Sequence, residues 1–373
     1  MSVSLKDIAD QGQFDTFENT GPLAHGLPAL AYTDTEFFKL EQEKLFSNSW
    51  MCVGYAHDLT KAGEAIPVDV GGQPIVLVRN ETGEIKAFQN VCRHRCMKLV
   101  DQPMNVGRLF KCPYHAWSYD LSGKLRAAPH FGGIDNQKPD NFDFDDYGLV
   151  PVPCDTWGHW IFVNLNGNAG NLSDHVAPLA NRLDGIDLAD LRLVGMLDFG
   201  EVDTNWKFLM ENFIEPYHVP VVHSGTTDQP LSDHYVVSEG TCLGSAVDIE
   251  RDDGVEGRAG SLNVSSRYLT LFPNFVLGRY FPDQLGVHLN LPVSADKTRQ
   301  YRAIYKTDGS EASVQETEQL MNLWWDVHKE DHDVCERLQQ GRASAISADG
   351  GVLSPCWESS VRRFQELVYQ AVQ

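Results

Sequence analysis

Asn90-Val-Cys92-Arg-His94-Arg-Cys96, followed by Cys112-Pro-Tyr-His115-Ala-Trp117, is the part of the sequence that decides the fold. Each stretch holds one Cys and one His at short spacing, C-x-H in the first and C-x2-H in the second. Each pair also lies on a turn-like segment between apolar runs typical of strands. The sequence therefore predicts two matching loops that bring two thiols and two imidazoles together.

Two metals accept this set of side chains. A structural zinc site often takes two Cys and two His, and in one kind of 2Fe-2S cluster two His replace two Cys on one iron. Zinc fingers group Cys with Cys and His with His, whereas each loop here holds one of each. The spacing favours the cluster, since two matching loops can place both Cys on one iron, and zinc remains the alternative.

The sequence around these loops predicts an α+β protein. Residues 46–170 contain short apolar runs separated by turns such as Gly71-Gly72, which is typical of an antiparallel β domain. We expect residues 1–45 to form an N-terminal arm with a helix near 35–45. Residues 171–373 then form a second domain, with a central antiparallel sheet flanked by helices. Its expected strands lie near 268–272, 275–277, 287–291 and 301–305, and a long helix covers 311–341.

Composition excludes some classes of function. The 373 residues include 30 Lys and Arg against 52 Asp and Glu, and a net charge of −22 disfavours nucleic-acid binding. The sequence has no signal-peptide pattern and no apolar run of about 20 residues, so we expect a cytoplasmic protein without a membrane segment. The eight irregularly spaced Cys favour reduced thiols over a disulfide framework.

A second group of candidate ligands follows residue 203. Residues 206–217 place apolar side chains at helical spacing, with Asp203 or Thr204 as the expected cap. Glu215 and His218 are three apart and would share a face of this helix. His218 and His223 are five apart with Pro220 between them, so the helix must deform there, and both imidazoles can converge. Singly, each His could be a hydrogen-bonded core residue.

An iron site of two His and one carboxylate needs a further acid. Asp331 lies on the apolar stripe of the expected long helix, with Val327 and Cys335 four residues to either side, where an unpaired carboxylate would be costly. Asp333 is surrounded by charged residues and should face water. We therefore expect Asp331, rather than Asp333, to complete the site.

Together these motifs resemble the Rieske non-haem iron oxygenase α subunits over residues 45–345. The resemblance rests on N-V-C-R-H-R-C, C-P-Y-H-A-W and E-N-F-I-E-P-Y-H with a further His five residues later. It implies a helix-grip-like catalytic domain that uses O2 as co-substrate. It also implies two centres, whose ligands are Cys92, His94, Cys112 and His115 for a Rieske 2Fe-2S cluster, and His218, His223 and Asp331 for a mononuclear Fe(II).

One position departs from this family, which usually has Gly where Cys96 stands. We interpret Cys96 as a small buried residue, and we expect Trp117 to cover the cluster. The family also implies partners. Electrons come from NAD(P)H through a flavin or iron-sulfur reductase or a ferredoxin, and the α subunits form a cyclic homotrimer. Glu215 would connect His218 to His115 of the neighbouring chain.

The family more often has Asp at the position of Glu215. A Glu there makes this sequence resemble the branch of the family that oxidises carnitine, choline or betaines by N-demethylation or C–N cleavage. Such small cations bind aromatic faces. The candidates for this pocket are Phe213, Tyr217, Tyr268, Phe272, Phe275, Tyr280 and Phe281.

The alternative substrate is an aromatic ring or aromatic carboxylate, bound by Arg267, Arg279 or His288 and attacked by a mono- or dioxygenase. A protein that only carries electrons is the distant alternative. It would not need the second domain.

Overall fold

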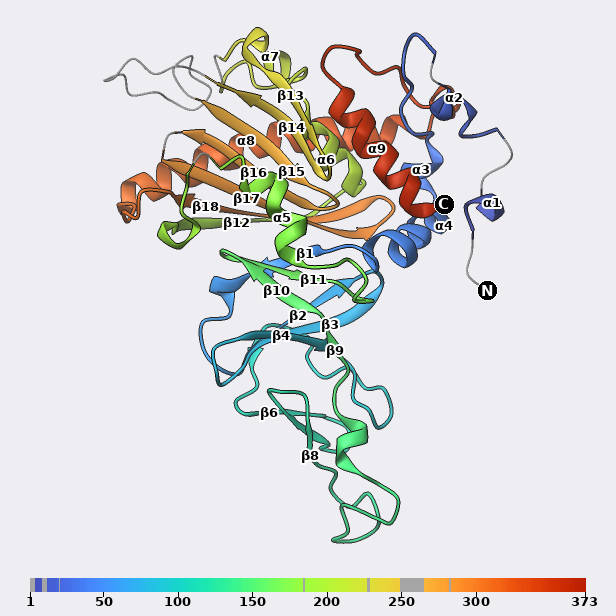
Figure 1. Ribbon diagram of the computed structural model, residues 1–373, viewed down its shortest axis with the longest axis vertical. Coiled ribbons are helices and arrows are strands. Elements are labelled where there is room, and N and C mark those ends of the chain that lie inside the picture. The colour runs from blue at the N-terminus through green and yellow to red at the C-terminus, as the bar shows by residue number, and fades with distance from the viewer. Residues whose placement is uncertain are drawn as a thin grey trace. The chain divides into compact units, whose positions relative to one another are not determined.

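Figure 1 shows the computed structural model of the chain, which describes residues 4–8, 12–19, 21–183, 185–226, 229–248, 265–281 and 283–373. The chain divides into two compact units. One is Phe46–Ser173, and the other combines Asp174–Gln373 with the residues up to Leu45. Among the described residues, no helix has the length and apolar character that crossing a bilayer requires.

The unit Phe46–Ser173 is built from three antiparallel sheets, as the turn-separated apolar runs predict. One sheet contains β1 (Met51–Tyr55), β11 (Trp160–Val163) and β10 (Cys154–Trp157), in that order. A second contains β5 (Met104–Asn105), β2 (Glu64–Val70), β3 (Gln73–Arg79), β4 (Ile85–Gln89) and β9 (Pro151–Val152). The third contains β6 (Leu109–Lys111), β7 (Ser118–Asp120) and β8 (Leu125–Ala127). Gly71 and Gly72 join β2 to β3 with φ of 55° and 73°, which glycine adopts without strain.

The other unit contains one seven-stranded antiparallel sheet. Its order is β12 (Arg192–Val202), β18 (Lys297–Lys306), β17 (Gln284–Ser294), β16 (Phe275–Phe281), β15 (Ser266–Leu271), β14 (Cys242–Val247) and β13 (Tyr235–Glu239). Six of these strands follow one another as a meander, and β12, the first in sequence, pairs with the last.

The helices of this second unit pack on the sheet and on one another. They are α1 (Leu5–Ile8), α2 (Asp15–Glu18), α3 (Leu30–Thr33), α4 (Thr35–Leu40), α6 (Trp206–Ile214), α7 (Val219–Val222), α8 (Val314–Gly341) and α9 (Ser359–Val372), and α5 (Leu172–Ala180) begins at the border between the units. Helix α6 packs against β14, β15 and β17, and both α8 and α9 pack against α6. The 28-residue α8 starts with a capping box between Ser313 and Glu316, which satisfies its first backbone amides.

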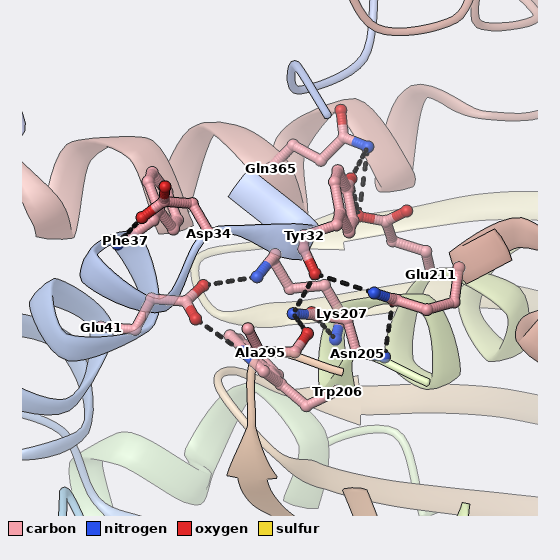
Figure 2. A network of polar contacts seen from close by, with 11 residues as sticks. Tyr32, Asp34, Phe37, Glu41, Asn205, Trp206, Lys207, Glu211, Ala295 and Gln365 are labelled. Atoms are coloured by element: carbon pink, nitrogen blue, oxygen red, sulfur yellow. Dashed lines mark hydrogen bonds and ion pairs between the residues drawn. The ribbon is translucent and has the colours of Figure 1, made fainter. Parts of the chain in front are cut away.

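A buried polar network joins the N-terminal helices to α6 (Figure 2). Lys207 Nζ lies 2.6 Å from Glu41 Oε1, and both side chains are fully buried. Trp206 Nε1 donates to the other oxygen of the same carboxylate at 3.1 Å. On the next turn of α6, Glu211 accepts a hydrogen bond from the Tyr32 hydroxyl at 2.7 Å. The N-terminal arm therefore belongs to the same compact unit as α6.

The α+β prediction is confirmed, and its omissions have physical causes. The strand predictions near 268–272, 275–277, 287–291 and 301–305 correspond to β15–β18, which are longer by up to several residues at their ends. Strand β12 and helix α9 are absent from the sequence prediction. Most residues of β12 are only half buried, so the strand lacks the continuous apolar run that marks its neighbours.

Candidate functional site

The two Cys/His loops have the same backbone design. Cys96 N–H donates to Cys92 O, and Ala116 N–H donates to Cys112 O, each at 3.0 Å. Cys92 N–H and Cys112 N–H in turn donate across their loops to Met97 O and Trp117 O, each at 2.8 Å. The residue four positions after each Cys has φ of 58°. Two equivalent loops therefore present one Cys and one His each.

Burial separates the two kinds of side chain. Cys92 and Cys112 are 1% and 3% exposed and lie in the core of the unit, whereas His94 is half buried and His115 is exposed. The His94 and His115 rings lie 4.7 Å apart between centroids. This arrangement fits a 2Fe-2S cluster whose inner iron takes both Cys and whose outer iron takes both His.

Neighbouring aromatic side chains support the loops. The Trp117 ring stacks on His94 with centroids 5.0 Å apart and is itself 2% exposed. The Tyr119 hydroxyl lies 3.2 Å from Cys92 Sγ and accepts from Arg93 N–H. Trp117 thus holds a cluster-loop imidazole from inside the core.

The interpretation of Cys96 as buried is wrong, because this side chain is exposed. Its backbone has a left-handed φ of 58°, which explains why glycine suits the position. Ala116 adopts the same φ in the other loop and is half buried, so both loops accept a small side chain at this position.

In the other unit, His218, His223 and Asp331 come together. One ligand atom from each lies within 4.8 Å of the others. His223 Nε2 is 3.0 Å from Asp331 Oδ1, and His218 Nε2 is 3.8 Å from the same oxygen. Two imidazole nitrogens and a carboxylate oxygen suit a non-haem Fe(II) with open positions. Asp333, the alternative acid, pairs with Arg337 at 2.9 Å on the exposed side of α8.

The helix that leads to this site ends earlier than the sequence predicts. Its N-cap is Asn205, whose side chain accepts from Lys207 N–H, and Thr204 instead donates its hydroxyl to Cys335 O. Helix α6 ends at Ile214, and Glu215 is extended because it precedes Pro216. Glu215 and His218 therefore do not share a helix face. They meet because the chain turns after Pro216.

A carboxylate holds the second nitrogen of each His. His218 Nδ1 lies 2.6 Å from Glu215 Oε1, and His223 Nδ1 lies 2.8 Å from Glu330 Oε2. Such pairs orient an imidazole and leave its Nε2 directed at a metal. Glu330 is missing from the sequence prediction. Its signal was its place next to Asp331 on α8, but charged neighbours and partial exposure make it look like a surface residue.

The electrostatics at His223 favour a cation. Burial opposes the charged imidazolium, but hydrogen bonds and charge from Asp331 and Glu330 together raise the pKa of His223 to about 9. A proton between His223 and Asp331 marks a position that a metal cation can take instead. The donor set and its charge therefore fit a mononuclear iron.

A cleft of about 750 Å³, partly open to solvent, lies over these residues. Three of the predicted aromatic candidates line it, namely Phe213, Tyr268 and Tyr280. Tyr217 is 53% exposed, so its predicted place in the pocket is wrong, because the helix ends before it. Phe272 packs on Phe364, Phe275 is buried in β16, and neither lines the described cleft. The side chain of Phe281 lies outside the described residues.

The proposed carboxylate binders also separate. Arg267 pairs with Asp248 at 2.7 Å, and neither it nor Arg279 lines the described cleft, whereas His288 does. The sequence prediction missed Arg302 and Trp324, which also line the cleft. Arg302 shares β18 with Arg299, which reaches the surface, so sequence alone gives little sign that Arg302 is buried.

Comparison with known families matches each unit to one family model. The model described as "Rieske [2Fe-2S] domain" matches residues 49–138, and the model described as "Ring hydroxylating alpha subunit (catalytic domain)" matches residues 188–373. These ranges contain all seven predicted metal ligands, four in the first and three in the second.

Two curated relatives and one solved structure extend the match. The carnitine monooxygenase oxygenase subunit of Escherichia coli K12 is 28% identical over 92% of this chain and 93% of its own length. The glycine betaine monooxygenase oxygenase subunit of Chromohalobacter salexigens is 34% identical over 53% of this chain and 43% of its own. A quaternary ammonium Rieske monooxygenase, described as giving insight into carnitine oxidation and inter-subunit electron transfer, is 25% identical, with a TM-score of 0.80 over 94% of this chain and 96% of its own.

Proposed function

Because the chain belongs to the Rieske non-haem iron oxygenase α subunits, we propose that it oxidises a quaternary ammonium compound with O2. The observation that carries the proposal is the convergence of His218, His223 and Asp331 at a cleft, in a chain that also holds the two Cys/His loops. When bound, the cluster supplies electrons and the mononuclear iron activates O2.

The protein's own side chains prepare the iron site. Glu215 and Glu330 hold the Nδ1 atoms of the two His, so both Nε2 atoms face the Asp331 carboxylate. The second oxygen of Glu215 accepts from the backbone amides of Tyr217 and His218, which fixes this carboxylate in place. Little reorganisation is then needed when the ligands bind iron.

Electrons enter from outside the chain. We propose a flavin or iron-sulfur reductase, or a ferredoxin, as their source, and a cyclic homotrimer as the assembly. In that assembly Glu215 connects His218 to His115 of the neighbouring subunit. Within one chain, this connection consists of the 2.6 Å contact between Glu215 Oε1 and His218 Nδ1. The inter-subunit electron transfer described for a solved relative supports the proposed contact between Glu215 and His115 of the neighbouring subunit.

A quaternary ammonium substrate is supported by the relatives and by the cleft. The relative matched along 92% of this chain acts on carnitine, and the relative matched along 53% of it acts on glycine betaine. Phe213 and Tyr268 line the cleft, with ring centroids 6.3 Å apart, and offer aromatic faces to a small cation. Each such contact contributes about 0.5–2 kcal/mol, depending on how fully water is excluded.

The reaction consumes O2, two electrons and two protons for each substrate molecule. One oxygen atom enters a C–H bond next to the quaternary nitrogen, and the other leaves as water. The hydroxylated product then splits into a tertiary amine and a carbonyl compound, so attack on an N-methyl group releases formaldehyde.

The test is O2 consumption by the purified enzyme with a surrogate reductase. The panel contains carnitine, glycine betaine, choline, benzoate and naphthalene, and formaldehyde, amines and product masses are recorded. We expect quaternary ammonium compounds to stimulate O2 uptake with matching amounts of amine and carbonyl product. Stimulation by the aromatic compounds alone would contradict the proposal.

A further inference from the structure

A buried guanidinium lines the cleft at a place that the proposed function leaves unexplained. Arg302, on β18, is 1% exposed and still contributes to the lining of the cleft. Its Cζ lies 3.7 Å from the centre of the Trp324 ring and 5.2 Å from the centre of the Tyr280 ring. Two aromatic faces of the cleft are thus in contact with a cation that belongs to the protein.

Two histidines, His288 and His328, lie beside Arg302. Arg302 Nη1 lies 3.0 Å from His328 Nε2, and because guanidinium only donates, this nitrogen of His328 accepts. His288 stands directly across from Arg302 on β17. Burial is the main cause that holds the pKa of both imidazoles well below its usual range. The positive charge of Arg302 and of neighbouring groups lowers the pKa further. Arg302 therefore contributes a permanent positive charge to the lining of the cleft.

The sheet makes room for this charge. A Cβ at Gly286, on β17, would lie 2.5 Å from Arg302 Nη2 and 3.0 Å from Cζ. A Cβ at Gly278, which pairs with Gly286 on β16, would lie 2.2 Å from the Tyr280 ring. Two facing glycines thus leave the space that the guanidinium and the Tyr280 ring occupy.

This arrangement limits which aromatic rings of the cleft are left for a substrate cation. Because Trp324 and Tyr280 already contact Arg302, the predicted aromatic faces left for a substrate cation are those of Phe213 and Tyr268. Phe213 also contacts His288, with ring centroids 5.0 Å apart. The Nε2 of His288 is buried and has no hydrogen-bond partner among the described residues.

We propose that Arg302 and His288 bind a carboxylate of the substrate, so that the enzyme selects quaternary ammonium compounds that also carry an acid group. The inference rests on the proposed function and narrows it to zwitterions of the betaine type. A guanidinium pairs with a carboxylate through charge-assisted hydrogen bonds, which are strong where water is excluded. A substrate with an alcohol or ester in that place forfeits this pairing.

The wild-type enzyme gives the first test, using pairs of substrates that differ only in the acid. Glycine betaine is compared with choline, and carnitine with its methyl ester, by kcat/KM for O2 uptake and by calorimetric binding. We expect the acid of each pair to be preferred by about 10- to 100-fold, the range of a hydrogen bond to a charged group. Equal values within a pair would overturn the inference.

Substitutions then assign the preference to Arg302. In Arg302→Gln we expect the acids to lose about 10- to 100-fold more in kcat/KM and affinity than choline loses in the same variant. Arg302→Lys should recover part of the loss, since it keeps the charge. Arg299→Gln is the matched control, because Arg299 lies on the same strand, is half buried and pairs with Asp198 at the surface.

A second variant guards against misfolding of Arg302→Gln, which melting curves and the visible spectrum of the cluster would reveal. Gly286→Ala keeps the charge and displaces the guanidinium, so it should also reduce the preference for acids. Equal losses for acids and choline in a folded variant would overturn this inference alone. A wild-type enzyme that turned over no quaternary ammonium compound would overturn the proposed function as well.

Discussion

At the scale of single residues, the carboxylates behind the two His decide which imidazole nitrogens are directed at the proposed iron site. Glu330 is the newly found member of this group, at 2.8 Å from His223 Nδ1. Its second contact, 3.4 Å from the Thr226 hydroxyl, restrains the same oxygen. We infer that Glu330 positions His223 rather than binding iron itself.

Replacing Glu330 by Ala should weaken iron binding at the mononuclear site about 10- to 100-fold, because His223 loses the partner that orients its ring. Iron retained per chain after competition with a chelator measures this effect. Asp333→Asn is the control, since Asp333 lies on the same helix and its carboxylate pairs with Arg337 at the surface. Equal iron retention in both variants would contradict the role of Glu330.

Replacing Glu215 by Gln should slow electron transfer and leave both metal centres in place. The amide keeps an acceptor for His218 but loses the charge that would favour a hydrogen bond from a cluster His. We expect about three iron atoms per chain and reoxidation of the reduced cluster that is at least about tenfold slower in a single turnover with O2 and substrate. An unchanged rate with full iron loading would exclude the bridging role.

The sequence predicted some of these residues and missed others for reasons that are physical. Asp331 stood out because a carboxylate on an apolar stripe needs a partner. Glu330 did not, because an acid at the edge of an exposed helix face is ordinary. Arg302 was missed because its burial depends on Gly286 in another strand, a long-range fact that no local pattern contains.

At the scale of elements, the end of α6 determines the geometry around the iron. Pro216 stops the helix at Ile214, so Glu215 becomes extended and turns back to cap the amides that follow. Helical periodicity in the sequence continues to Tyr217 and hides this change. The existence of the helix could therefore be predicted from sequence, but its last turn could not.

The start of α6 is fixed by the buried pair of Lys207 and Glu41 (Figure 2). Lys207→Met should lower the free energy of unfolding of this unit by about 3–5 kcal/mol, because the buried Glu41 carboxylate loses its cation and keeps only the Trp206 N–H. The double variant Lys207→Met with Glu41→Leu should lose clearly less stability, since the Glu41 carboxylate is removed together with its cation. Urea unfolding followed by fluorescence compares the two. A double variant less stable than Lys207→Met would contradict the account of this pair.

At the scale of the whole molecule, stability depends on pH through buried His residues that remain neutral in the folded state. Burial, and then the charge of His159, lower the pKa of His57 to about 4. Between the ordinary pKa of about 6.5 and this value, the unfolded chain binds a proton that the folded chain excludes. The contribution of His57 is therefore complete above pH 6.5 and is lost as the pH falls toward 4.

His57→Gln should make the Phe46–Ser173 unit less sensitive to acid. The wild type loses stability between pH 7.5 and pH 5, and we expect this loss to be about 1 kcal/mol smaller in the variant. The effect is modest because water still reaches part of the ring. Urea midpoints at both pH values, monitored by the absorbance of the cluster, measure it. The same pH dependence in the variant and the wild type would rule out this contribution.

The proposed assembly, in which the two metal centres of neighbouring chains meet, can be tested with mixed oligomers. Cys112→Ala removes a cluster ligand and Asp331→Ala removes an iron ligand, so each variant alone should be inactive. The two chains are co-expressed with different tags and purified by both tags. In the proposed ring, such a mixture places one intact cluster beside the intact iron site of a different chain. If electrons pass between neighbours in a cyclic trimer, these rings should recover about a third of the wild-type activity, one productive contact of three. Mixed rings that carry both kinds of metal centre and remain inactive would contradict it.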